Sequence, residues 1–143
     1  MSYMHYEDND DQTGRLNTHE MCMLRDLLIA PYMLDLVDVH KGYADRSGAV
    51  LRKLNGLLAE TLMDIITQDL SDLRTDLRSR QIKTWEMDQD HIALYVGYNC
   101  RGYSDKFGMT KEAARGEIRV QLGEYMGDVI QHLRVLPKTR QSK

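Results

Sequence analysis

The feature that most constrains the fold is a long apolar pattern over residues 48–80. Leucine, isoleucine and valine recur at intervals of one, three and four positions from Val50 to Leu77. This spacing is typical of an amphipathic helix, which unbroken would measure about 50 Å at ~1.5 Å per residue. A globular domain of this size has a radius of gyration of only ~14–15 Å. The helix therefore either breaks at Asn55-Gly56, overhangs the domain, or packs against another chain.

Helices are also predicted on both sides of this segment. Asn17 can cap a first helix that continues to about residue 40, and Glu20 stands three positions later, as in a capping box. Pro31 either kinks this helix or starts a second one. Thr110 caps a last helix that runs to about Leu133.

The period of the apolar pattern changes from 3.6 to 2 in the middle of the chain. Residues 82–87 alternate, a turn-forming sequence follows, and residues 91–99 alternate again, which predicts a β-hairpin. The expected fold is α+β and mainly helical, in the order α-α-β-β-α, with a single hairpin packed on helices. We expect one domain over residues 17–136, a disordered acidic tail over 1–16 and a basic tail over 137–143, the last beginning at a proline.

Composition excludes several classes of protein. Apolar residues make up 42% and charged residues 29% of the 143 positions, which is ordinary for a globular protein. No run of ~18 apolar residues predicts a membrane span, and the acidic N-terminus does not read as a signal peptide. Two cysteines are too few for a disulfide framework and favour a reducing compartment, so we expect a cytoplasmic protein.

Residues with catalytic or metal-binding chemistry are isolated along the chain. His19 and Cys22 lie three positions apart on a predicted helix and could share a metal, although the remaining soft ligands are scattered. Cys100 precedes Arg101, which could lower a thiol pKa, but no known nucleophile motif surrounds it. We therefore predict no enzyme activity, no cofactor and no metal.

Charge is distributed unevenly. Residues 1–70 hold twelve acidic and six basic residues, whereas residues 71–143 hold ten acidic and thirteen basic ones. Basic and aromatic side chains that interleave can hold single-stranded nucleic acid, unless the aromatic rings belong to the core. The candidate surface for nucleic acid or another partner comprises Arg78, Arg80, Lys83, Trp85, Arg101, Tyr103, Lys106, Lys111, Arg115 and Arg119.

The sequence also predicts that the chain associates with a second copy of itself. The apolar stripe of the long helix continues to Leu73 and Leu77, and exposed apolar area of that length is seldom left bare on a monomer. Gly116, Gly123 and Gly127 share one face of the last helix and would let another helix approach closely. These five residues are the candidate contacts of a homodimer with twofold symmetry.

Three short motifs carry a resemblance. They are Met23–Asp26, Asp69–Lys83 and Cys100–Tyr103. In this order the chain resembles small, functionally uncharacterised proteins of Gram-positive bacteria and their phages, over about residues 20–130. The resemblance implies a cytoplasmic, free-standing helical protein with a small hairpin, and it brings no activity or catalytic residues with it.

The leading functional hypothesis is a non-enzymatic regulatory or adaptor protein that acts through contacts with an unknown protein partner. It depends on the overlong helix and the glycine stripe, and on the absence of a catalytic set. The alternative is a nucleic-acid-binding accessory protein that uses the basic and aromatic surface.

Overall fold

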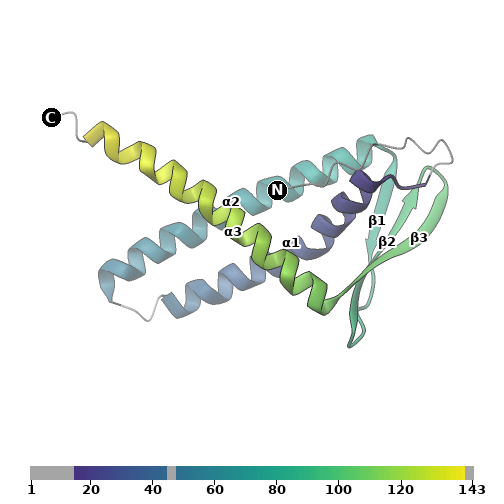
Figure 1. Ribbon diagram of the computed structural model, residues 1–143, viewed down its shortest axis with the longest axis horizontal. Helices are drawn as coiled ribbons and strands as arrows, with labels where there is room; N and C mark the ends of the chain where they lie inside the picture. Colours follow the sequence, from purple (N-terminus) through teal and green to yellow (C-terminus); the bar gives the residue numbers. More distant parts are fainter. Residues whose placement is uncertain (1–14, 45–47, 141–143) are drawn as a thin grey trace.

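The chain folds into three long helices and one small antiparallel sheet (Figure 1). The computed structural model describes residues 15–44 and 48–140. Helices α1 (Thr18–Ala44) and α2 (Ala49–Ser79) come first, then strands β1 (Ile82–Glu86), β2 (Ala93–Cys100) and β3 (Tyr103–Thr110), then helix α3 (Lys111–Arg140). The expected α+β, mainly helical class is confirmed. The sheet has three strands rather than the two of a single hairpin.

Helix α1 begins with the predicted capping box. The amide of Glu20 donates to Asn17 Oδ1 at 2.7 Å, and the amide of Asn17 donates to Glu20 Oε1 at 3.1 Å. The helix continues through Pro31 without interruption. Side chains on both sides of the proline, such as Ile29 and Met33, are buried against the rest of the chain. This packing outweighs the helix hydrogen bond that proline cannot make.

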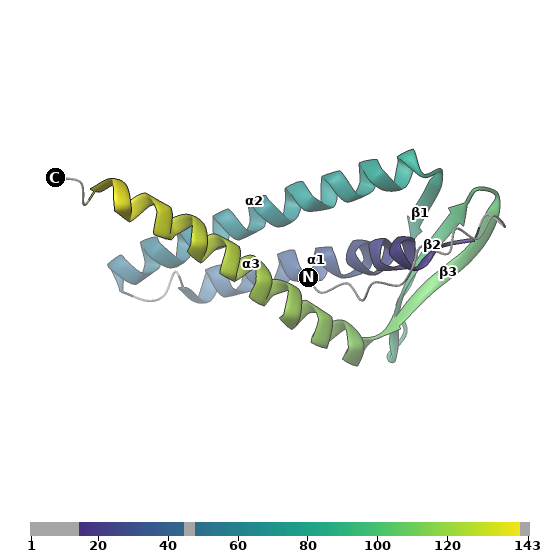
Figure 2. The same cartoon turned by 45° about the horizontal axis from the view of Figure 1, so that its top comes forward.

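Helix α2 is unbroken across Asn55-Gly56, so the long apolar pattern forms one continuous helix. Its 31 residues extend about 46 Å at ~1.5 Å per residue. Ala59, Leu62 and Ile66 are buried in a core cluster that also includes Ile29 and Met33 of α1. Helix α1 runs alongside α2 in the opposite direction (Figures 1 and 2). Helix α3 crosses α2 obliquely, and its C-terminal end lies away from the tip of the α1–α2 hairpin (Figure 1).

The third strand exists because Arg101 and Gly102 form a two-residue hairpin turn. Cys100 pairs with Tyr103, and both turn residues have positive φ, 50° for Arg101 and 94° for Gly102. Positive φ at both central positions is the requirement of a type I′ turn, which matches the twist of the strands. β2 therefore becomes the central strand, paired with β1 on one side and β3 on the other.

The buried side chains form two clusters. One lies among the three helices and includes Ile66, Leu94 and Ile118. The other joins the start of α1, the end of α2 and the sheet, and includes Leu16, Leu24 and Leu77. Leu77 was expected on a dimer surface. It is only 2% exposed and therefore belongs to the core instead.

The limits of the domain differ from the expected 17–136. Leu16 is buried, so the folded part includes at least Arg15 and Leu16, and α3 continues through Pro137 to Arg140. Of the expected tails, residues 1–14 and 141–143 lie outside the described residues, whereas residues 137–140 belong to α3. Within the described ranges, no helix has the length and apolar character of a membrane span.

Candidate functional sites

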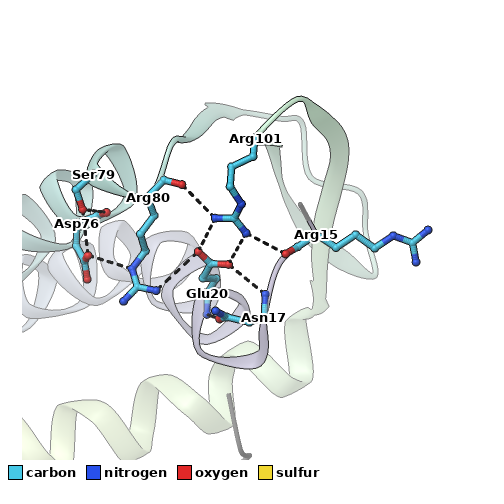
Figure 3. Close-up of polar contacts among 7 residues, drawn as sticks. All are labelled: Arg15, Asn17, Glu20, Asp76, Ser79, Arg80 and Arg101. Atoms are coloured by element: carbon cyan, nitrogen blue, oxygen red, sulfur yellow. Dashed lines mark hydrogen bonds and ion pairs between the residues drawn. The ribbon is translucent and has the colours of Figure 1, made fainter. Parts of the chain in front are cut away.

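The most connected polar site is the Glu20 cluster, formed by Glu20, Arg80 and Arg101 (Figure 3). Arg101 donates to both carboxylate oxygens of Glu20, with Nη2–Oε1 at 3.1 Å and Nη1–Oε2 at 3.2 Å. Arg80 Nη1 lies 3.8 Å from Oε2. The Glu20 side chain is only 2% exposed. A bidentate guanidinium is the strongest partner a buried carboxylate can have.

Arg101 also forms hydrogen bonds with the backbone around the cluster. Its guanidinium donates to the carbonyl oxygens of Arg80 at 3.1 Å and Arg15 at 3.0 Å. Arg80 in turn donates from Nε to Asp76 Oδ1 at 3.1 Å. The cluster therefore joins the start of α1, the end of α2 and the β2–β3 turn.

The environment of Glu20 keeps its carboxyl ionised. Burial alone would raise the pKa of Glu20, but the hydrogen bond from Arg101, the amide of Asn17 and the charges of Arg101 and Arg80 together lower it below the ordinary value. A general acid needs the opposite shift. The cluster is thus suited to holding the fold together, and it engages two of the expected partner-binding bases.

Other members of the predicted basic and aromatic set lie in different places. Tyr103 has the guanidinium of Arg15 5.6 Å from its ring centroid. Lys111 begins α3, and its amide donates to the Ile92 carbonyl at 2.8 Å. The set also includes three arginines that lie at exposed positions on the helices rather than on the sheet: Arg78, Arg115 and Arg119.

Three predicted residues do come together on the sheet. The strand register places ten residues on the face turned away from the core, here called the outer face. It comprises Lys83, Trp85, Ala93, Tyr95, Gly97, Asn99, Ser104, Lys106, Gly108 and Thr110.

Two glycines make room for the aromatic rings of the outer face. Trp85 pairs with Gly97 and Tyr95 pairs with Gly108. A Cβ added at Gly97 would collide with the five-membered ring of Trp85, and one added at Gly108 would lie 2.7 Å from Tyr95 Cδ1. The Nζ of Lys106 lies 4.6 Å from the Tyr95 ring centroid, within the range of a cation–π interaction.

Helix α3 carries a stripe of small and apolar residues on its exposed side. Spacings of three and four connect Ala113, Gly116, Val120, Gly123, Gly127 and Ile130. The stripe lies about 170° around the helix from the buried side chains of α3, at 3.6 residues per turn. A Cβ added at Gly116, Gly123 or Gly127 would meet nothing within 4 Å. This α3 stripe contains all three glycines that were predicted for self-association.

Helix α2 has a second apolar stripe that the sequence analysis did not separate from the first. Val50, Leu54 and Leu57 are 81%, 48% and 55% exposed. They lie about 150° around the helix from its buried face, again at 3.6 residues per turn. Sorting residues 48–60 by helical angle would have revealed this α2 stripe.

The thiols and carboxylates do not form a reactive set. Cys100 is completely buried, and that burial, despite the nearby Arg101, raises the pKa of its thiol. A crevice of about 320 Å³ is lined by Asp26, Asp69, Asp72 and Asp76. All four accept hydrogen bonds from neighbouring side chains, including Tyr125 at 2.6 Å and Gln121 at 2.7 Å. Within residues 15–44 and 48–140, no three metal-ligating side chains converge.

Comparison with known proteins gives one match. No curated protein and no solved structure matches the chain significantly. The model of one protein family, described as YhjD protein, matches residues 15–130. The matched region contains the Glu20 cluster, all three strands and the α3 stripe. Because it covers well over half of the sequence, the chain belongs to the YhjD protein family.

Proposed function

We propose that this protein is a non-enzymatic regulatory or adaptor protein that acts through protein contacts and forms a homodimer. The observation that carries the proposal is the pair of exposed apolar stripes on α2 and α3. Exposed apolar residues scattered singly need no explanation, but contiguous ones mark interaction surfaces. Both stripes repeat every three or four residues, the spacing by which helices pack against other helices.

The α3 stripe is suited to pairing with a second copy of itself. In an antiparallel pair with a twofold axis between residues 121 and 122, Val120 faces Gly123 of the partner subunit. Ile130 faces Ala113 of the partner subunit, and Gly116 faces Gly127 of the partner subunit. Every large side chain of the stripe then meets a small one, as a self-complementary interface requires.

The α2 stripe then remains available for a different protein. Val50, Leu54 and Leu57 present bulky apolar side chains, with Lys53 and Glu60 beside them. An apolar seam with charged flanks is the usual contact surface of an amphipathic partner helix.

Two measurements test these assignments. Light scattering coupled to size exclusion at about 100 μM, far above the Kd of a stable dimer, should give twice the 16.6 kDa of the single chain. A photo-crosslinking residue at Leu54 should capture a partner from native lysate, whereas one at Arg78 should not. A monomer at that concentration, together with equal capture from both positions, would refute the proposal.

We also propose a cytoplasmic location and an origin in Gram-positive bacteria or their phages. Both cysteines are free thiols, which favours a reducing compartment, and the origin rests on the resemblance of the three short motifs. Fractionation of cells that express the protein from its own promoter tests the location.

A further inference from the structure

We propose that the outer face of the sheet binds single-stranded nucleic acid. In this proposal, bases stack on Trp85 and Tyr95 while phosphates contact Lys83 and Lys106. The surface is separate from the α2 and α3 stripes, so it can operate whether or not the protein is an adaptor.

The geometry of the rings carries the first step. Three atoms of the Trp85 five-membered ring crowd the position of a Gly97 Cβ, so the indole covers that glycine with one of its faces. The opposite face points away from the sheet, and Trp85 is 47% exposed. The Tyr95 ring lies against Gly108 through Cδ1 and Cε1, and Lys106 Nζ lies over the ring at 4.6 Å from its centroid, so Trp85 offers the more open stacking face. Open aromatic faces on a sheet are what unpaired bases stack on, without regard to their sequence.

The charge of the surface carries the second step. Among the ten outer-face residues two are lysines and none is acidic. Both lysines are exposed, and Lys106 lies next to the Tyr95 ring. The carboxylate of Asp90 lies at the rim and accepts a hydrogen bond from the Tyr95 hydroxyl at 3.0 Å. It thereby fixes the orientation of the ring.

The size of the surface favours a single strand over other polyanions. Three strands spaced ~4.8 Å apart span only about 10 Å, which is enough for a few nucleotides. The bases of a duplex are stacked on one another and cannot reach the two rings. An acidic polypeptide would satisfy the lysines but would make no use of the open aromatic faces.

Binding can be followed by the intrinsic fluorescence of Trp85, because it is the one tryptophan in the sequence. A 15-nucleotide oligothymidine should quench the Trp85 fluorescence in a saturable way, and the matching duplex should not. Salt should weaken binding by an amount that reflects two phosphate contacts. A plot of the logarithm of the binding constant against the logarithm of the salt concentration, measured between about 50 and 200 mM, should have a slope of about −1.4.

Variants are compared by the anisotropy of a labelled oligonucleotide. Trp85→Ala should weaken binding ~10-fold, and Trp85→Phe, which keeps a stacking ring, should restore most of the affinity. Lys83→Ala combined with Lys106→Ala should abolish the salt dependence. Arg52→Ala removes an exposed basic residue from α2, away from both the sheet and the α2 stripe, and should leave oligonucleotide binding unchanged.

Several results would overturn the proposal. They are the absence of binding at low salt, equal affinity for the duplex, and equal affinity for polyglutamate. A Trp85→Ala protein that keeps the circular dichroism of the natural protein and binds equally well would also overturn it.

Discussion

The two ends of the molecule differ in how far their side chains are buried or paired with other side chains of the same chain. At the sheet end, the buried Glu20 carboxylate has a bidentate arginine, and Leu77 packs against strands and helix. At the other end, Val50, Leu54 and Leu57 point into solvent. The same helix, α2, connects the two ends. One end thus buries or pairs its side chains within the chain, whereas the other leaves apolar side chains exposed, and the proposed contact surface rests on this difference.

Truncating a leucine at each end of α2 should separate the two regions most clearly. Leu77→Ala leaves a cavity in the core and should lower the free energy of unfolding by about 2–5 kcal/mol. Leu57→Ala removes an exposed side chain and should cost less than about 0.5 kcal/mol in the monomer. Urea denaturation of both variants at low protein concentration checks this, and equal losses would contradict the contrast.

The Glu20 cluster should be the next most sensitive point. Glu20→Gln removes the buried negative charge that Arg101 and Arg80 contact and should cost about 2–3 kcal/mol. This is below the usual range for a buried pair, because both arginines are partly exposed. Glu60→Gln breaks the exposed pair with Lys41 and serves as the control, with an expected loss of at most about 1 kcal/mol. Chemical denaturation at pH 7 measures both.

Acid should reveal the same cluster without any mutation. The folded-state pKa of Glu20 lies below its ordinary value of 4.5, so the unfolded chain binds the proton more readily. The stabilisation is complete above that ordinary pKa and is lost as pH falls through the lower folded-state pKa. Urea midpoints measured from pH 7 to pH 3 should therefore decline less in Glu20→Gln than in the natural protein. Parallel curves would exclude Glu20 as the source.

The smallest expected effect has opposite signs in the fold and in the dimer. Gly123→Ala should stabilise α3 by up to about 1 kcal/mol, since glycine is a poor helix former and the added methyl meets no neighbour within the chain. The same methyl should weaken a dimer that brings Val120 of the partner subunit against residue 123. Thermal unfolding and light scattering give the two readouts. A variant with an unchanged dimer would move the interface away from the α3 stripe.

The helices and the starts of α1 and α3 could be predicted because the signals are local, whereas the expected ends of α1 near residue 40 and α3 near Leu133 fall short of Ala44 and Arg140. The 3.6-residue period gave α2, the capping box gave the start of α1, and Thr110 caps α3 through a bond from the Ala113 amide at 3.1 Å. β3 was missed because its side chains are mostly exposed and its sequence shows no clear alternation. The turn before it places a positive φ on Arg101, a residue that carries no turn signal of its own.

The candidate sites needed the three-dimensional structure for a different reason. Glu20 read only as part of a cap, because its arginine partners lie far along the chain. The outer face needed the register of all three strands before Trp85, Tyr95 and Lys106 could be placed together. The α2 stripe was hidden within a longer apolar pattern that also supplies the core.

The turn at Arg101 and Gly102 also has a consequence for the order of folding. The β2–β3 hairpin involves neighbours in sequence and can form early, and it sets the position of Arg101 without help from the rest of the chain. The bond to Glu20 closes a loop of 81 residues, whose entropy must be lost before the contact is gained. That contact therefore belongs to the last steps of folding, so weakening it should speed unfolding and leave the folding rate nearly unchanged. We therefore expect a weakened Glu20 cluster to shorten the lifetime of the native state.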